Sequence, residues 1–77
     1  MDRLSAALQV MQVRREEARA AMALAAEIRA LVPLAKKDEQ RVLASVAEHA
    51  LSEAINAVLL WNVARAERDR ATEARAA

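Results

Sequence analysis

The sequence of 77 residues contains no cysteine, glycine, phenylalanine or tyrosine, and only one proline, one tryptophan and one histidine. Without cysteine the chain cannot form a disulfide or a cysteine-ligated zinc site, and it suits a reducing compartment. Without glycine it cannot build a glycine-rich phosphate-binding loop. These absences remove the usual covalent and metal supports of a small domain. Stability therefore has to come from packing within the chain or against another chain.

A large excess of charge of one sign is also missing, because 12 basic residues face 11 acidic ones and leave a net charge of +1. Nucleic-acid-binding domains usually carry a clear basic excess, so no nucleic-acid partner is expected. The first residues, Met1 to Ser5, lack the basic start and apolar stretch of a signal peptide. The longest apolar segment, Ala54 to Ala64, is interrupted by asparagines and falls short of the roughly 20 residues of a membrane-spanning helix. We therefore expect no membrane span and a soluble, cytoplasmic protein.

Strong helix formers dominate the residues that are present, whereas β-branched residues are sparse. Pro33 is the one break signal, because a proline inside a helix loses a hydrogen bond and clashes with the preceding turn. The sequence predicts a single all-α domain over residues 1–77, with a helix over about 2–31 and a second helix over about 39–75. Between them we expect a loop over about 32–38, with Asp38 as the N-cap of the second helix. Such a short loop makes the two long helices antiparallel neighbours in a helical hairpin.

Both predicted helices have more apolar surface than one neighbouring helix covers. The first carries two adjacent apolar stripes, one from Leu4 to Ala25 and the other from Val10 to Leu31. The second carries an alanine-rich main stripe from Leu43 to Trp61, which suits the contact between the helices, and further apolar residues around it. A two-helix hairpin buries only one side of each helix, so the rest needs a partner chain or a second copy of this chain.

The residues expected to bind that partner are Val10, Val13, Leu24, Ile28, Ile55, Leu59, Leu60, Trp61 and Val63. Two roles remain open for Trp61, as the largest side chain between the helices or as an interface anchor of the kind enriched at binding hot spots. The alternating charges of residues 65–75 indicate either a solvated helix end or a recognition tail.

No arrangement for catalysis, metal binding or cofactor binding is visible in the sequence. His49 and Glu53 share a helix face, but a metal site needs three or four ligands and no others are predicted nearby. The serines have no second histidine that could act as a base, and two helices form no concave site. The sequence therefore predicts a protein that is not an enzyme and has no metal or cofactor.

Three features resemble a known family. Leu4 and Leu8 precede the segment Arg15-Glu16-Glu17-Ala18-Arg19, the layout is two helices with one loop in mid-chain, and the segment 52–61 places a glutamate and an isoleucine before bulky aliphatics closed by an aromatic. In these respects the chain resembles the small co-chaperones of bacterial type III secretion needle subunits, the YscE/SsaE-type proteins. The resemblance spans most of the chain, although the loop is shorter and the charged residues after Ala64 have no match. It implies a complex with a larger helical-repeat chaperone and the needle subunit. In that complex the protein would stabilise the chaperone and so keep the needle subunit from polymerising in the cytoplasm.

A second interpretation stays open, in which two hairpins pair into a self-associating structural bundle, a homodimer or tetramer of natural or designed origin. A homo-oligomer buries the same patch on each subunit by symmetry, whereas a heteromeric module leaves a patch exposed when it is alone. Uneven patterning argues against a designed origin, because designed helices usually show clean heptads and explicit caps.

Overall fold

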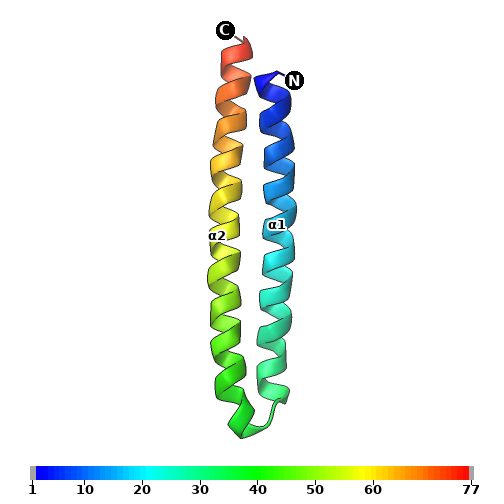
Figure 1. Cartoon of the computed structure of the whole chain (residues 1–77), viewed down its shortest axis with the longest axis vertical. Helices are drawn as coiled ribbons and strands as arrows, with labels where there is room; N and C mark the ends of the chain where they lie inside the picture. Colours follow the sequence, from blue (N-terminus) through cyan, green and yellow to red (C-terminus); the bar gives the residue numbers. More distant parts are fainter. Residues whose placement is uncertain (1, 77) are drawn as a thin grey trace.

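The computed structural model describes residues 2–76 and consists of two long α-helices joined by a short turn (Figure 1). Helix α1 spans Arg3–Leu31, the short 3₁₀ turn η1 spans Val32–Leu34, and helix α2 spans Lys37–Ala76. The helices lie side by side and antiparallel, with both chain ends at one end of the molecule and the turn at the other. The predicted all-α helical hairpin is thus confirmed.

The start of α1 is capped as its sequence suggests. Asp2 precedes the helix in an extended conformation, and its Oδ1 accepts a hydrogen bond of 2.7 Å from the backbone amide of Ser5. Such a bond satisfies one of the first amides of a helix, which have no partner within the helix itself. The helix then continues unbroken to Leu31, two residues before Pro33, as the prediction required.

The start of α2 differs from the prediction by two residues. Asp38 is not its N-cap, because the helix already begins at Lys37 and the carbonyl of Lys36 accepts from the amides of Glu39 and Gln40. Asp38 and Glu39 instead lie in the first turn, where negative charge is favourable next to the positive end of the helix dipole. A backbone carbonyl and the dipole together start the helix without a capping side chain.

Gln40 also closes the turn between the helices, since its Nε2 donates a bond of 3.2 Å to the carbonyl of Ala35. Pro33 lies inside η1, where its fixed backbone angle is tolerated and its missing N–H is not needed.

The contact between the helices follows a spacing of alternately three and four residues, which is the pattern of a coiled coil. In α1 the side chains on this line are Leu4, Ala7, Met11, Arg14, Ala18, Ala21, Ala25 and Ile28. In α2 they are Gln40, Leu43, Ala47, Ala50, Ala54, Ala57, Trp61, Ala64, Arg68 and Ala71. All of these are buried or half-buried, and we call the two lines together the seam.

Every fully buried residue of the described chain is an alanine of the seam. These residues are Ala18, Ala25, Ala50, Ala54, Ala64 and Ala71. Alanine lets two helix backbones approach closely, but each methyl group removes little apolar area from water. The seam therefore fixes the register of the hairpin while contributing a small hydrophobic core.

The seam of α1 runs along the border between the two predicted stripes. It takes Ala18 and Ala25 from one stripe and Ala21 and Ile28 from the other. Most large residues of both stripes are left on either side of the contact, whereas Leu4, Met11 and Ile28 lie in it half-buried. The molecule is consequently a rod of 60 × 14 × 13 Å with a radius of gyration of 17.4 Å. A compact chain of this length would have a radius of gyration of about 11.5 Å.

Candidate protein-binding surface

Large apolar side chains cover much of the rod instead of filling an interior. Fourteen of them are between 38% and 80% exposed, and no large side chain is fully buried among the described residues. The chain exposes 5902 Å². A compact monomer of this mass exposes about 4,600 Å², so the surplus is about 1,300 Å². This exposed apolar area is the most unusual feature of the structure.

One group of these side chains lies along one side of the seam. Val10 of α1 and Leu60 of α2 line the same shallow groove, together with Arg3 and Glu67, and the remaining members recur at the seven-residue spacing that keeps them on that side. We call this side the acidic face. Its apolar members are Val10, Val13, Leu24, Leu31, Val42, Val46, Leu60 and Val63, and its glutamates are Glu17, Glu27, Glu39, Glu53 and Glu67.

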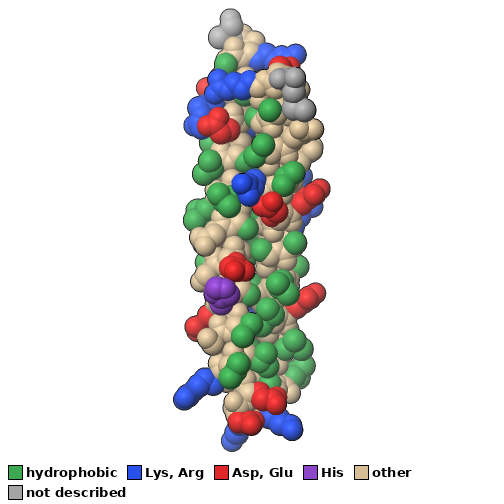
Figure 2. Space-filling model, in the orientation of Figure 1, with side chains coloured by type: hydrophobic (Ala, Val, Ile, Leu, Met, Phe, Trp, Pro, Cys, Tyr) green, Lys and Arg blue, Asp and Glu red, His purple; other side chains and the backbone are tan. Residues whose placement is uncertain are grey.

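Figure 2 shows the face of the rod that carries the histidine, where hydrophobic side chains of both helices run along the length with acidic groups and some basic groups between them. The acidic face therefore presents apolar contact area along the hairpin, edged by negative charge. A partner helix laid along it would cover apolar residues from both helices of the hairpin.

A second group lies along the opposite side of the seam. Near the turn, Met22 and Arg29 of α1 and Leu51 of α2 border a groove of about 770 Å³, whose floor includes buried Ala25 and Ala54. We call this side the basic face. Its large apolar members are Leu8, Met22, Leu51, Ile55 and Val58, and its arginines are Arg15, Arg19, Arg29, Arg41 and Arg65.

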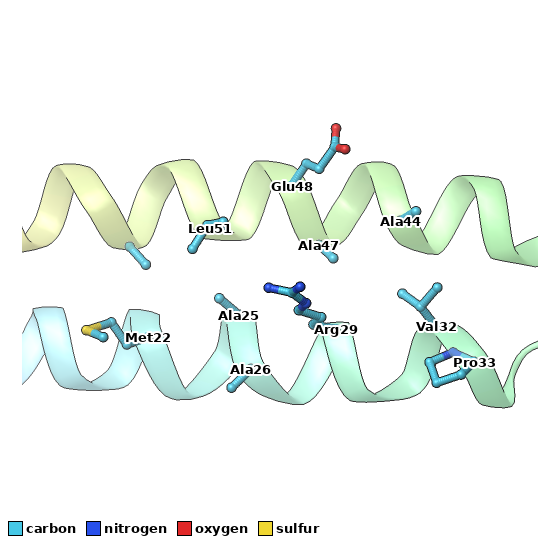
Figure 3. A pocket seen from close by; sticks show the side chains of 11 residues that line it. Met22, Ala25, Ala26, Arg29, Val32, Pro33, Ala44, Ala47, Glu48 and Leu51 are labelled. Carbon is cyan, nitrogen blue, oxygen red and sulfur yellow. The ribbon is translucent and has the colours of Figure 1, made fainter.

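Figure 3 shows this groove from close by, with Met22 and Leu51 at one end and Val32 and Pro33 at the other. The guanidinium of Arg29 extends over the gap between the helices, whereas the carboxylate of Glu48 points away from it. The groove therefore offers a positive group above an apolar floor of small side chains.

The structure separates the predicted partner-binding residues into four places. Val10, Val13, Leu24, Leu60 and Val63 lie together on the acidic face, and all five are between 46% and 60% exposed. Of the other four, Ile55 is on the basic face, Ile28 and Trp61 are half-buried in the seam, and Leu59 is on the outer side of α2, turned away from α1.

The predicted partner-binding residues do not include six further exposed residues of the two faces, namely Leu8, Met22, Leu31, Val42, Val46 and Leu51. The signal that would have found them is the recurrence of small residues at alternating steps of three and four, which marks the seam and hence its two flanks.

Trp61 lies in the seam with its ring half-exposed, next to a cation from its own helix. The guanidinium carbon of Arg65 is 5.3 Å from the ring centroid, within range of a cation–π interaction. The same guanidinium donates a bond of 2.8 Å to the side-chain oxygen of Asn62. Of the two roles open to Trp61, the seam role describes its position, and its ring contacts Arg65 of the basic face.

The single histidine has one partner. Nε2 of His49 lies 3.2 Å from Oε1 of Glu53, one helical turn further along, and both side chains are largely exposed. Within residues 2–76 no three histidine or acidic side chains come together as potential metal ligands.

The charged end of α2 is a regular helix lying beside the start of α1. Arg3 lies 3.8 Å from Glu67, and Arg75 lies 3.6 Å from Asp2, so two ion pairs join the helices at the open end. The amide of Ser5 holds the pKa of Asp2 below its ordinary value, and Arg75 acts in the same direction. Arg70 lowers the pKa of Glu67, with a smaller contribution from Arg3. The tail of residues 65–75 is thus paired with its own chain.

Helix α2 also contains a stretch that is long and apolar enough to cross a membrane by length and composition, with 11% of that stretch buried in the hairpin. The prediction of no membrane span considered only uninterrupted apolar runs and did not count this longer, mixed stretch. Core helices of soluble proteins meet the same criterion.

Comparisons of the chain with protein-family models, with curated proteins and with solved structures found no match. The resemblance to the type III secretion co-chaperones therefore stays a prediction.

Proposed function

We propose that the chain is a non-catalytic protein-binding hairpin whose exposed faces pack against helices of another chain. One observation carries the proposal: all the fully buried residues are alanines, while fourteen large apolar residues remain exposed beside them. Monomeric proteins rarely leave apolar patches of this extent open, and such patches commonly mark interaction sites. Amphipathic helices bind in this way, by laying an apolar side into a groove of the partner.

The most specific form of the proposal is the co-chaperone role that the resemblance implies. In that role the hairpin packs against a helical-repeat chaperone and helps it hold the needle subunit as a monomer. An elongated, weakly cored hairpin suits this task, because its folding is completed by the chaperone it binds. Between Arg41 and Arg65 the apolar stretch of α2 contains two acidic residues, Glu48 and Glu53, which favour docking on protein helices over insertion into a bilayer.

Two adjacent leucines provide a matched test. Leu60 lies on the acidic face and is 46% exposed, whereas Leu59 lies on the outer side of α2 and is 55% exposed. Leu60→Asp should break the complex, because it places a charge within the apolar contact area. Leu59→Asp makes the same chemical change outside that area and should leave the complex intact.

The measurement is the molar mass of each purified chain by light scattering, alone and mixed with a helical-repeat chaperone and needle subunit from the same cell. Circular dichroism reports whether each variant keeps its helices. A loss of complex by Leu60→Asp alone, with helix content retained, supports the proposal. Equal behaviour of the two variants, or a fully helical monomer that binds neither protein, contradicts it.

A further inference from the structure

The two faces of the hairpin differ in charge. On the acidic face the five glutamates outnumber three arginines, Arg3 and Arg70 and the seam residue Arg14, which lines the same groove. On the basic face the five arginines outnumber two acids, Glu48 and Asp69. Although the net charge is only +1, the molecule therefore has one negative and one positive side.

These opposite charges also lie at matching heights along the rod. Residues two apart on an α-helix point to opposite sides and differ in height by only about 3 Å. Four of the five glutamates of the acidic face have an arginine of the basic face two positions away: Glu17 with Arg15 and Arg19, Glu27 with Arg29, Glu39 with Arg41, and Glu67 with Arg65. The exception, Glu53, has apolar residues at those positions and is paired with His49. Glu17 is also paired within its own chain, with Arg14, and Glu67 with Arg70, but all of these pairs are solvent-exposed and can rearrange when a second copy docks.

We infer that a second copy of the chain docks on the hairpin, with its acidic face against the basic face of the first. The inference rests on the proposed function in one respect, that both faces bind helices. If the second copy lies directly above the first without rotation, each of the four glutamates faces an arginine of the other copy. The apolar residues between the charges then meet in the centre of the contact, which gives the interface an apolar middle and a charged rim.

The exposed area fits two such contacts per chain. The smaller standard-size interfaces bury about 600 Å² on each partner, so the surplus surface of about 1,300 Å² is enough for two of them. Because the contact joins two different faces, every copy that docks presents one free face of each kind. Such head-to-tail contacts form open stacks when no rotation closes them. Charge pairing at the rim makes the stack sensitive to salt.

The test uses two full-length variants with reversed charges. Arg15→Glu with Arg29→Glu makes the basic face negative, and Glu17→Arg with Glu27→Arg makes the acidic face positive. A control, Glu16→Arg with Glu73→Arg, makes the same change of charge as the acidic-face variant, but on exposed residues of the outer sides of the helices. Sedimentation velocity and circular dichroism are measured for each protein over a concentration series, and for the two face variants mixed in equal amounts.

The wild type and the control should give a mass that rises with concentration beyond a dimer, and less so in high salt. Each face variant alone should need about a tenfold higher concentration to associate, since several rim pairs become repulsive. Their mixture should restore association, because it pairs two negative faces with two positive ones. Absent rescue in the mixture overturns the inference, and so does a closed dimer that neither reversal affects. A wild type that stays monomeric at every concentration also overturns it, while a heterologous partner on these faces would still stand.

Discussion

The seam and the two faces beside it differ in the size of their residues and in how deeply these residues are buried. Along the seam, alanines such as Ala54 are completely buried and hold the helices close together. A few positions away, residues such as Leu24 and Val63 remain more than half exposed. In an ordinary domain the large residues would form the core. Here most of them lie outside the contact that defines the fold. The small residues therefore set the register of the helices, and the large ones form the surface that we propose binds a partner.

Trp61→Ala should have the largest effect on the fold, because it removes the one large aromatic side chain of the seam. The expected loss of free energy of unfolding is about 2–4 kcal/mol, given that part of the ring is already exposed. Ile55→Ala, on a residue of the basic face that is 53% exposed, should cost less than about 1 kcal/mol. Urea unfolding followed by circular dichroism at one fixed protein concentration measures both. Equal losses of free energy of unfolding in the two variants would contradict the view that the seam supports the fold more than the faces do.

Ala54→Leu tests the seam from the other direction, by adding volume where the helices are in closest contact. Ala54 is 0% exposed, and overpacking at such a site typically costs about 1–3 kcal/mol. Ala23→Leu makes the same change on an exposed position of the outer side of α1 and should change stability by less than about 0.5 kcal/mol. The midpoint of thermal unfolding reports the difference. An Ala54→Leu protein as stable as Ala23→Leu would mean that the helices are not held at the spacing alanine allows.

Acidification should produce a smaller effect, confined to the open end of the hairpin. The folded protein lowers the pKa of Asp2 and of Glu67 below their ordinary values of 3.8 and 4.5. The unfolded chain therefore binds protons more readily, and the stability that these carboxylates contribute is present above those values and lost as the pH falls through the lowered pKa values. Protection of the amides in the first turn of α1, measured as their exchange rate relative to that of an unfolded chain at the same pH, should fall below about pH 4 in the wild type. In Asp2→Ala, which removes the acceptor, protection should already be low at neutral pH. A wild type that shows no loss of protection on acidification would contradict the assignment.

The outline of the fold was predictable from the sequence for simple reasons. Pro33 marks the only break in a chain of helix formers, and the short segment after it allows only an antiparallel return. The error at Asp38 arose because a capping side chain was expected, whereas a backbone carbonyl and two acidic residues of the first turn start α2.

The seam of α1 was harder to predict because half of its residues are alanines, which have low values on a hydropathy scale. Hydrophobic periodicity follows the largest residues, and in α1 these form two stripes with the true contact between them. The same bias placed Ile28 among the partner-binding residues, although it is half-buried in the seam. It also placed Leu59 among the partner-binding residues, although Leu59 lies on the outer side of α2, about 100° around the helix from Leu60. The charge difference between the faces became visible only once the seam was known.

We propose that the large apolar residues bind a partner and that the alanine seam by itself gives the hairpin little stability. The most direct test is a dilution series of the purified wild type, with molar mass from light scattering and helix content from circular dichroism measured on the same samples. The account predicts that the mass exceeds 8.4 kDa at high concentration and that helix content and melting temperature fall as the complexes dissociate. A monomer of 8.4 kDa with full helix content and a melting temperature independent of concentration would contradict it.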